Sequence, residues 1–289
     1  MTVHALAPAS TANLGPAFDC AAAALELWNE VIVEESDAAV VEIEGEGAAE
    51  LPRDASHLTL RAFALFAPVE RYRFRFVNRI PLERGLGSSA AAIALGLVAG
   101  SAVAGADSAP AELLPHAAGL EGHADNVAAA LFGGVCVAWW NGGDVRAARI
   151  ADGLPLAPVV AVPSERTRTE QSRNSLPAMV AHADAAANAG FAALLGAAVA
   201  SGDAELLRAA FNDRLHEQYR ADGAPLLGAI RSSATDGALG VTLSGSGPSV
   251  VVWTAHERAE DVAARLREAL SDDTRVLPLR VAQEGARLA

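Results

Sequence analysis

Two glycines and two serines stand directly before a long uncharged segment, in the stretch Pro81-Leu82-Glu83-Arg84-Gly85-Leu86-Gly87-Ser88-Ser89-Ala90-Ala91. Residues 85–106 carry no charge, and the pattern predicts a helix over about 90–105. Glycine allows the backbone to adopt positive φ and to come close to a ligand. A helix start offers free N–H groups and a partial positive charge, which suit phosphate. The stretch is either an anion-binding loop or an ordinary loop that caps a core helix.

The charged residues limit how such a loop could hold a nucleotide. The chain has 289 residues and a net charge of −13, and all 22 basic residues are arginine. The lack of lysine excludes a Walker-type P-loop, a Schiff-base lysine and the active-site lysine of protein kinases. A triphosphate would rely on backbone amides, a metal ion and Arg84. The acidic balance argues against a nucleic-acid partner.

Cysteine content and the N-terminus favour a cytoplasmic protein with no membrane partner. The two cysteines, Cys20 and Cys136, form neither a disulfide framework nor a zinc spacing. The first residues lack the basic and apolar regions of a signal peptide. Residues 85–106 are long enough to span a bilayer, but alanine and glycine contribute little insertion energy. We therefore expect a buried core helix there.

Strand-like and helical segments alternate irregularly, which predicts an α+β fold. Along residues 72–77 aromatic residues alternate with arginine, so these arginines are expected on a solvated strand face. A charged region with glycine and proline, 144–158, is interpreted as the boundary between domains 1–150 and 151–289. The second half is predicted to be helix-rich, with separate helices over 178–189, 191–201, 204–211 and 225–233.

Two further turns carry polar residues that could face a ligand. The first is Pro8-Ala9-Ser10-Thr11-Ala12-Asn13-Leu14-Gly15-Pro16-Ala17-Phe18-Asp19. The second is Ser244-Gly245-Ser246-Gly247-Pro248-Ser249, between two strand-like runs. Taken alone, each fits an ordinary turn whose polar side chains bond their own backbone.

In their order and spacing, the three motifs resemble those of the GHMP kinases, most closely the homoserine kinase branch. Three more pieces are similar to that branch: Glu121-Gly122-His123-Ala124-Asp125-Asn126-Val127-Ala128, Thr169-x-x-x-Arg173-x-x-Leu176-Pro177 and Asp213-Arg214-Leu215-His216-Glu217-Gln218-Tyr219-Arg220. Together these cover nearly the whole chain. The resemblance implies two α+β lobes, the N-terminal one binding ATP, with the active site in the cleft between them. It also implies phosphorylation of the side-chain hydroxyl of L-homoserine, a step of threonine biosynthesis.

The resemblance also implies roles for individual residues. Residues 81–91 would wrap ATP, and Ser88 and Glu121 would hold Mg²⁺, which prefers hard oxygen ligands. The residues that would grip the amino acid are Asn13, Asp19, His123, Asn126, Arg173, Arg220 and Gly245. Two arginines can neutralise a carboxylate, and Asp19 can balance an ammonium group.

The homoserine branch resembles a design without a dedicated catalytic base, in which Asn126 orients the acceptor hydroxyl. Asp125 is the alternative candidate for a base, and His123 could be a base or a neutral substrate contact. A kinase for another small alcohol and an inactive nucleotide-binding protein stay open as alternatives. Members of the family are often dimers, which leaves a homodimer open as well.

Some positions depart from the family or fit it loosely. Many relatives have Gly where Ala17 stands and Leu-Gly where Cys20-Ala21 stand, and Ala17 would be strained at positive φ. The adenine pocket is not assigned, although residues 57–59 fall near it by resemblance. Trp139 and Trp140 are expected in the core or at an interface.

Overall fold

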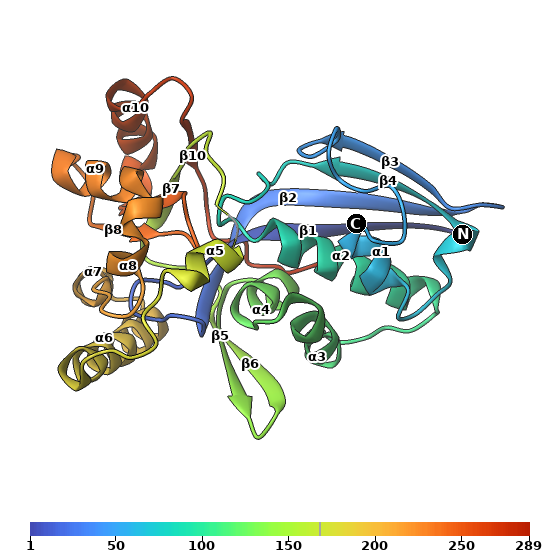
Figure 1. Ribbon diagram of the computed structural model, residues 1–289, viewed down its shortest axis with the longest axis horizontal. Helices are drawn as coiled ribbons and strands as arrows, with labels where there is room; N and C mark the ends of the chain where they lie inside the picture. Colours follow the sequence, from blue (N-terminus) through green and yellow to red (C-terminus); the bar gives the residue numbers. More distant parts are fainter. Residues whose placement is uncertain (168) are drawn as a thin grey trace.

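Two β-sheets, each with helices packed against it, form two lobes in the computed structural model, which describes residues 1–167 and 169–289 (Figure 1). In the described chain the first sheet runs β11-β1-β2-β4-β3, with β5 paired to β2 and β6 paired to β5. Its strands are β1 Thr2–Ala12, β2 Ala21–Glu35, β3 Val40–Gly45, β4 Tyr72–Asn78, β5 Val135–Asn141, β6 Asp144–Ala151 and β11 Arg287–Leu288.

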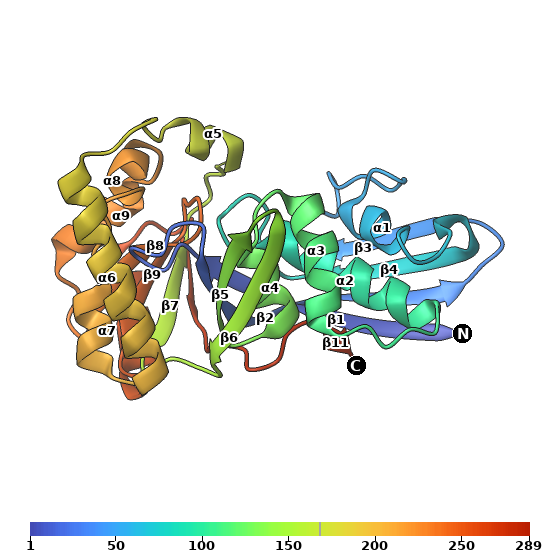
Figure 2. The same ribbon diagram turned by 90° about the horizontal axis from the view of Figure 1, so that it is seen from below.

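Helices cover one face of the first sheet (Figures 1 and 2). They are α1 Leu58–Phe63, α2 Ser88–Val103, α3 Pro110–Glu121 and α4 Asp125–Phe132. The small residues of α2 let α1 approach closely, because a Cβ on Gly96 would lie 2.2 Å from the carbonyl oxygen of Thr59. The buried side chains of α2 confirm the prediction of a core helix.

The alternation predicted for residues 72–77 is confirmed in β4. Phe74 and Phe76 are buried, whereas Arg73 and Arg75 are exposed. Because successive side chains of a strand point to opposite faces, the aromatic rings enter the core and the arginines meet water.

The second lobe has a sheet in the order β10-β7-β9-β8, so the predicted α+β fold is confirmed. Its strands are β7 Ala157–Val162, β8 Gly240–Leu243, β9 Val250–Thr254 and β10 Arg275–Pro278. Its helices are α5 Thr169–Asn174, α6 His182–Ser201, α7 Ala204–Ala210, α8 Glu217–Arg220, α9 Pro225–Ser233 and α10 Ala259–Ala269.

The region 144–158, interpreted as the boundary between the domains, begins with strand β6 of the first sheet and ends at the start of β7 in the second sheet. Strand β6 is joined to β5 by a turn in which Gly142 and Gly143 have positive φ. One helix prediction was wrong. One continuous helix, α6, replaces the two expected over 178–189 and 191–201, since a single Gly190 costs only about 1 kcal/mol in a helix. Trp139 and Trp140 are 46% and 55% exposed, so they do not lie in the core, and their expected place at an interface stays a prediction.

Helix α6 is also the one described helix long and apolar enough to cross a bilayer by length and composition alone. One such helix is weak evidence for a membrane span, because helices of soluble proteins pass the same test. Here α6 packs beside α7 at the outer side of the second lobe (Figure 2).

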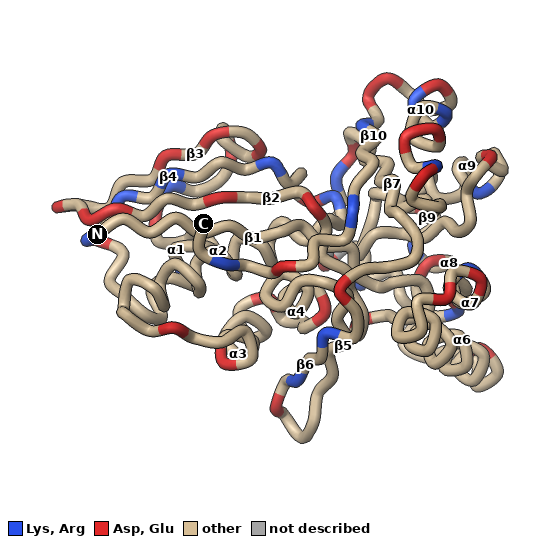
Figure 3. Tube along the Cα trace, turned by 180° about the vertical axis from the view of Figure 1, so that it is seen from behind, with Lys and Arg blue, Asp and Glu red and all other residues tan. Residues whose placement is uncertain are grey.

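The two lobes are joined by a strand pairing and by ion pairs between distant parts of the chain. Strand β11 pairs with β1, so the C-terminus returns to the first lobe. Arg166 donates two hydrogen bonds to Glu50, and Arg275 donates one to Glu46 across the junction. Figure 3 places acidic and basic segments together in this region. These contacts hold the two lobes on either side of a cleft.

Candidate active site

The three sequence motifs meet in a cleft of about 310 Å³ between the lobes. The predicted site residues that line it are Asn13, Asp19, Glu83, Gly85, Gly87, Ser88, Ser89, Glu121, His123, Asp125, Asn126, Arg173 and Gly245. Thr167 and Ser246 line it too and were missed by sequence reasoning. The predicted residues that do not line it are Pro81, Leu82, Arg84, Leu86, Ala90, Ala91 and Arg220.

The glycine-rich loop presents its backbone to the cleft. Gly85 and Gly87 have φ of 73° and 66°, and Gly87 is the N-cap of α2. A Cβ on Gly85 would lie 2.1 Å from the carbonyl oxygen of Ser244, and one on Gly87 would lie 2.1 Å from Oγ of Ser10. Because the cap residue has no side chain, the first N–H groups of α2 stay available to an anion.

Hydrogen bonds connect the glycine-rich loop to the other two motifs. The hydroxyl of Ser244 lies 2.7 Å from the carbonyl oxygen of Gly85 and 2.9 Å from Oγ1 of Thr11. The amide of Asn13 donates to the carbonyl oxygen of Gly245 at 3.0 Å. Three segments that are distant in sequence therefore form one polar wall.

Arg84 points away from the cleft. Its guanidinium donates to the carbonyl oxygens of Leu82, Pro163 and Ser164, at 2.6–3.0 Å. These bonds tie the glycine-rich loop to the second lobe. In this arrangement the side chain braces the loop from outside instead of reaching a phosphate.

An ion pair stands in the cleft facing the glycine-rich loop. Arg173, on α5, donates two hydrogen bonds of 2.8 Å to the carboxylate of Asp19. The hydrogen bonds to Asp19 raise the pKa of Arg173. Asn13 and Asp19 both have positive φ, 56° and 55°, and Oδ1 of Asn13 accepts from the backbone N–H of Asp19. Ala17, in contrast, is not among the described residues with positive φ, so it carries no such strain.

Arg220, on α8, lies behind the wall of the cleft. It is 4% exposed, and its NH1 donates to the carbonyl oxygen of Gly245 at 3.1 Å. Its guanidinium lies 5.2 Å from the ring centre of Phe18, and its buried Nε has no hydrogen-bond partner among the described residues. Burial lowers the pKa of Arg220. This arginine also lines a neighbouring pocket of about 480 Å³, which shares Thr167 and Ser246 with the cleft.

Glu121 supplies a carboxylate at the start of α2. It accepts a hydrogen bond from the hydroxyl of Ser89, and burial raises its pKa. Among the described residues, no group of three or more His, Cys, Asp and Glu side chains could hold a metal ion. The carboxylate and the serine hydroxyls nevertheless fit Mg²⁺, which keeps several waters and takes phosphate oxygens as further ligands. Glu121 and Ser88 would hold it there.

Asp125 is engaged by its neighbours. Its Oδ1 accepts from Nδ1 of His123 and from the backbone N–H of Asn126, both at 2.8 Å. Burial opposes a charge on His123, but the bond to Asp125 and the nearby carboxylates outweigh it and raise the pKa of His123. The amide nitrogen of Asn126 donates to Oγ of Ser10 at 2.8 Å. This bond fixes the orientation of the amide group, whose oxygen can accept a hydrogen bond from a ligand.

A further pocket of about 470 Å³, separate from the one lined by Arg220, adjoins the cleft at Glu83, Ser88 and Ser89. Its apolar side chains are Leu51, Pro52, Leu58, Leu82, Ala92 and Leu95. Nδ1 of His57 accepts from the backbone N–H of Thr59, so Nε2 carries the hydrogen, and Nε2 is buried without a partner. Size, apolar lining and an unused donor suit a nucleobase next to a phosphate site. Asn29 and Asn78 also line it and were missed by sequence reasoning.

We expect the stability of the fold to depend on His57 in acid. Burial lowers the pKa of His57 from 6.5 to about 4. The unfolded chain therefore binds the proton first, so stability present above pH 6.5 is lost as the pH falls towards 4, by about 3 kcal/mol in total. Urea unfolding at pH 7 and pH 4 should show a smaller loss for His57→Asn, which keeps a helix-capping side chain but does not titrate. Equal losses in both proteins would contradict this prediction.

Known proteins share both the sequence and this architecture. Family models described as the GHMP kinases N terminal domain and GHMP kinases C terminal match residues 50–134 and 184–272. A homoserine kinase of Streptomyces avermitilis is 43% identical over 273 residues, covering 91% of this chain and 89% of the relative. One of Streptomyces coelicolor is 42% identical, with 91% and 87% covered. The crystal structure of homoserine kinase from Cytophaga hutchinsonii has a TM-score of 0.85 at 27% identity, covering 100% and 97%. The chain therefore belongs to the GHMP kinases, in the group formed by the homoserine kinases.

Proposed function

We propose that the protein transfers the γ-phosphoryl group of ATP to the side-chain hydroxyl of L-homoserine, giving O-phospho-L-homoserine for threonine biosynthesis. The observation that carries this proposal is the Asp19–Arg173 ion pair, set in the cleft together with a glycine-rich helix start. The names of the curated relatives support the same substrate. The two free cysteines, Cys20 and Cys136, suit the reducing cytoplasm as the location of the enzyme.

A zwitterion matches an ion pair better than a net anion does. The carboxylate of an amino acid can approach Arg173 while its ammonium group approaches Asp19, so charges alternate around four groups. Mevalonate has a carboxylate but no ammonium group, and it would leave Asp19 facing an anion. The resemblance assigns Arg220 to the same carboxylate, and Arg220 lies directly behind Gly245, whose carbonyl oxygen accepts a hydrogen bond from it. The site chemistry thus favours an amino acid as acceptor.

The donor side supports a nucleotide triphosphate. The free N–H groups at the start of α2 and the turn at Gly85 and Gly87 suit phosphates without any lysine. When bound at Glu121 and Ser88, Mg²⁺ neutralises charge that develops on the phosphate oxygens. The apolar pocket around Leu58 and Leu95 would take the base.

Positioning accounts for the chemical step in this proposal. The amide oxygen of Asn126 can accept the hydrogen of the acceptor hydroxyl and orient its oxygen toward the phosphate. Asp125 already accepts two hydrogen bonds through Oδ1, which supports an orienting role toward His123 and Asn126 instead of proton removal. Transfer in line then needs no dedicated base: the new O–P bond forms as the bond to the ADP leaving group breaks, and the hydroxyl proton passes to an oxygen of the transferred phosphoryl group.

The test is an ADP-release assay with Mg-ATP and a panel of acceptors. L-homoserine, D-homoserine, L-serine, mevalonate and galactose are offered in parallel. Turnover confined to L-homoserine is expected. Faster turnover with mevalonate or galactose would favour a kinase for another alcohol, and ATP binding without any turnover would favour an inactive member of the family.

Arg173→Ala should raise KM for L-homoserine by about 10-fold to 100-fold, because a hydrogen bond to a charged group is worth about 1.5–3 kcal/mol. KM for ATP should stay unchanged, since Arg173 bonds Asp19 and no part of the glycine-rich loop. Initial-rate kinetics with each substrate varied in turn measure both constants. Arg208→Ala is the matched control, because the partner of Arg208 among the described residues is Glu205, on the surface of α7. An unchanged KM for homoserine in Arg173→Ala would refute the carboxylate role.

A further inference from the structure

A buried histidine, His216, joins the two sides of the cleft, although the proposed reaction does not use it. It directly precedes α8 and is 0% exposed. Its Nε2 lies 2.9 Å from the carbonyl oxygen of Gly15, which belongs to the N-terminal motif. Its Nδ1 lies 3.4 Å from NH1 of Arg220. The ring thus connects the first lobe to an arginine of the second.

The two contacts determine where the hydrogen of the ring lies. A carbonyl oxygen only accepts, so Nε2 of His216 must carry the hydrogen. Burial lowers the pKa of His216, which keeps the ring neutral and leaves a lone pair on Nδ1. That lone pair accepts from Arg220. A doubly protonated ring would instead direct an N–H group at a guanidinium.

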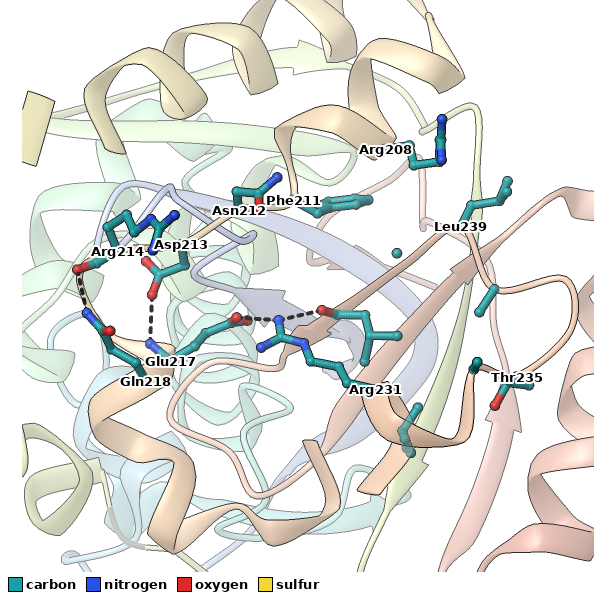
Figure 4. Close-up of a pocket in the computed structure, with 15 residues that line it drawn as sticks. Arg208, Phe211, Asn212, Asp213, Arg214, Glu217, Gln218, Arg231, Thr235 and Leu239 are labelled. Carbon is teal, nitrogen blue, oxygen red and sulfur yellow. Dashed lines mark hydrogen bonds and ion pairs between the residues drawn. The ribbon is translucent and has the colours of Figure 1, made fainter. Parts of the chain in front are cut away.

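The backbone that carries Arg220 is held by carboxylates, one of which, that of Asp213, also lies 3.6 Å from Nε2 of His216. The carboxylate of Asp213 accepts from the backbone N–H groups of Leu215, His216 and Glu217, at 2.7–3.1 Å. Glu217 in turn accepts from Arg231 and from the backbone N–H of Leu243. Figure 4 shows a pocket lined by Asp213, Glu217 and Arg231, in which Glu217 points toward Arg231 and Asp213 lies beside the start of α8. With α8 fixed in this way, the remaining freedom belongs to the side chain of Arg220.

That side-chain freedom is considerable for an arginine, at about 2 kcal/mol of rotamer entropy. NH1 of Arg220 is held by two acceptors, the carbonyl oxygen of Gly245 and Nδ1 of His216. The ring of Phe18 packs against both side chains. Its centre lies 5.4 Å from the ring centre of His216 and 5.2 Å from the guanidinium of Arg220. Among the described residues its Nε has no hydrogen-bond partner and is buried, and the side chain lines the pocket of about 480 Å³ next to the cleft.

We propose that His216 is a positioning residue, whose ring holds Arg220 in the orientation that receives the carboxylate of the acceptor. The proposal rests on the proposed function, which makes an amino acid the acceptor. It predicts that loss of the Nδ1 acceptor weakens acceptor binding and leaves the nucleotide site and the chemical step unaffected. A merely structural histidine would affect stability without this selectivity.

Two amide variants separate the two contacts of the ring. His216→Asn keeps an acceptor near the position of Nδ1, whereas His216→Gln keeps a donor near the position of Nε2. We expect Kd and KM for L-homoserine to rise about 10-fold in His216→Gln and less than about 3-fold in His216→Asn, with kcat and KM for ATP unchanged in both. Equal effects of the two variants, or a larger effect in His216→Asn, would overturn the proposal. Thermal unfolding checks that both variants are folded.

A double-mutant cycle with Arg220→Ala tests whether His216 acts through this arginine. In the Arg220→Ala background, His216→Gln should cause no further rise in Kd for L-homoserine, whereas additive effects would contradict the proposal. His256→Gln is the control, because Nε2 of His256 also bonds a carbonyl oxygen, that of Leu154, outside the cleft. Calorimetry measures Kd without turnover, so a wild-type protein that binds homoserine but does not phosphorylate it refutes only the proposed function. Wild-type protein that does not bind it refutes both.

Discussion

Gly85→Ala is expected to lower kcat/KM for Mg-ATP at least 100-fold. The residue has a φ of 73°, where an added Cβ costs about 1–2 kcal/mol. The Cβ would also lie 2.1 Å from the carbonyl oxygen of Ser244 and 2.9 Å from that of Gly247. Both obstacles are backbone atoms and cannot rotate away. The loop must therefore move, and a displacement of about 1 Å at a reacting group can cost 100-fold in rate.

A matched glycine separates the clash from the backbone strain. Gly105 has a φ of 72°, nearly that of Gly85, but a Cβ there would meet no atom within 4 Å. Gly105→Ala should therefore lower the free energy of unfolding by about 1–2 kcal/mol and leave kcat/KM unchanged. Initial rates and urea unfolding of both variants give the comparison. A Gly85→Ala enzyme as active as Gly105→Ala would show that the contact with the third motif does not position the loop.

The parts of the site that sequence could predict are those encoded by neighbouring residues. Gly85 and Gly87 precede an uncharged helix, and this local pattern predicts the helix and a loop at its start that is either an anion site or an ordinary cap. The aromatic and arginine alternation of β4 is equally local, and both faces are as predicted. Strand β6 lacked such a signal, because Val145 is the one buried residue in it. Its charged residues led to the interpretation of the segment as a boundary between domains.

Contacts between distant segments could not be derived in this way. Asp19 and Arg173 are 154 positions apart, and nothing local indicates that they pair with each other before a substrate arrives. The pocket proposed for the nucleobase draws Asn29 from within β2 and Asn78 from the end of β4, so neither residue stands in a motif. Arg220 was assigned to the substrate by resemblance, and its position behind Gly245 appears only in the folded chain. Sequence thus identified most chemical groups, whereas the fold supplies their pairing.

Glu121→Gln is the second substitution with a large expected effect, a fall in kcat of about 100-fold to 1,000-fold. Glutamine has nearly the same shape and can still accept the hydrogen bond from Ser89, so the start of α2 should keep its geometry. Only the negative charge is removed, and with it the anionic oxygen proposed for Mg²⁺. Losing one group that stabilises developing charge typically costs this much in kcat. The Mg²⁺ concentration that gives half-maximal rate should rise in parallel.

Two further variants identify the cause of that loss. Ser89→Ala removes the hydrogen bond but keeps the carboxylate, so it should cost far less in kcat than Glu121→Gln if charge is what matters. Glu112→Gln changes the same residue type at the opposite end of α3, where Glu112 accepts from the backbone N–H of Ala109, and it should leave kcat unaltered. Rates measured across a Mg²⁺ titration decide between the two roles of Glu121. If Ser89→Ala were as inactive as Glu121→Gln, the carboxylate would act by holding the loop, because removing either partner would then have the same consequence.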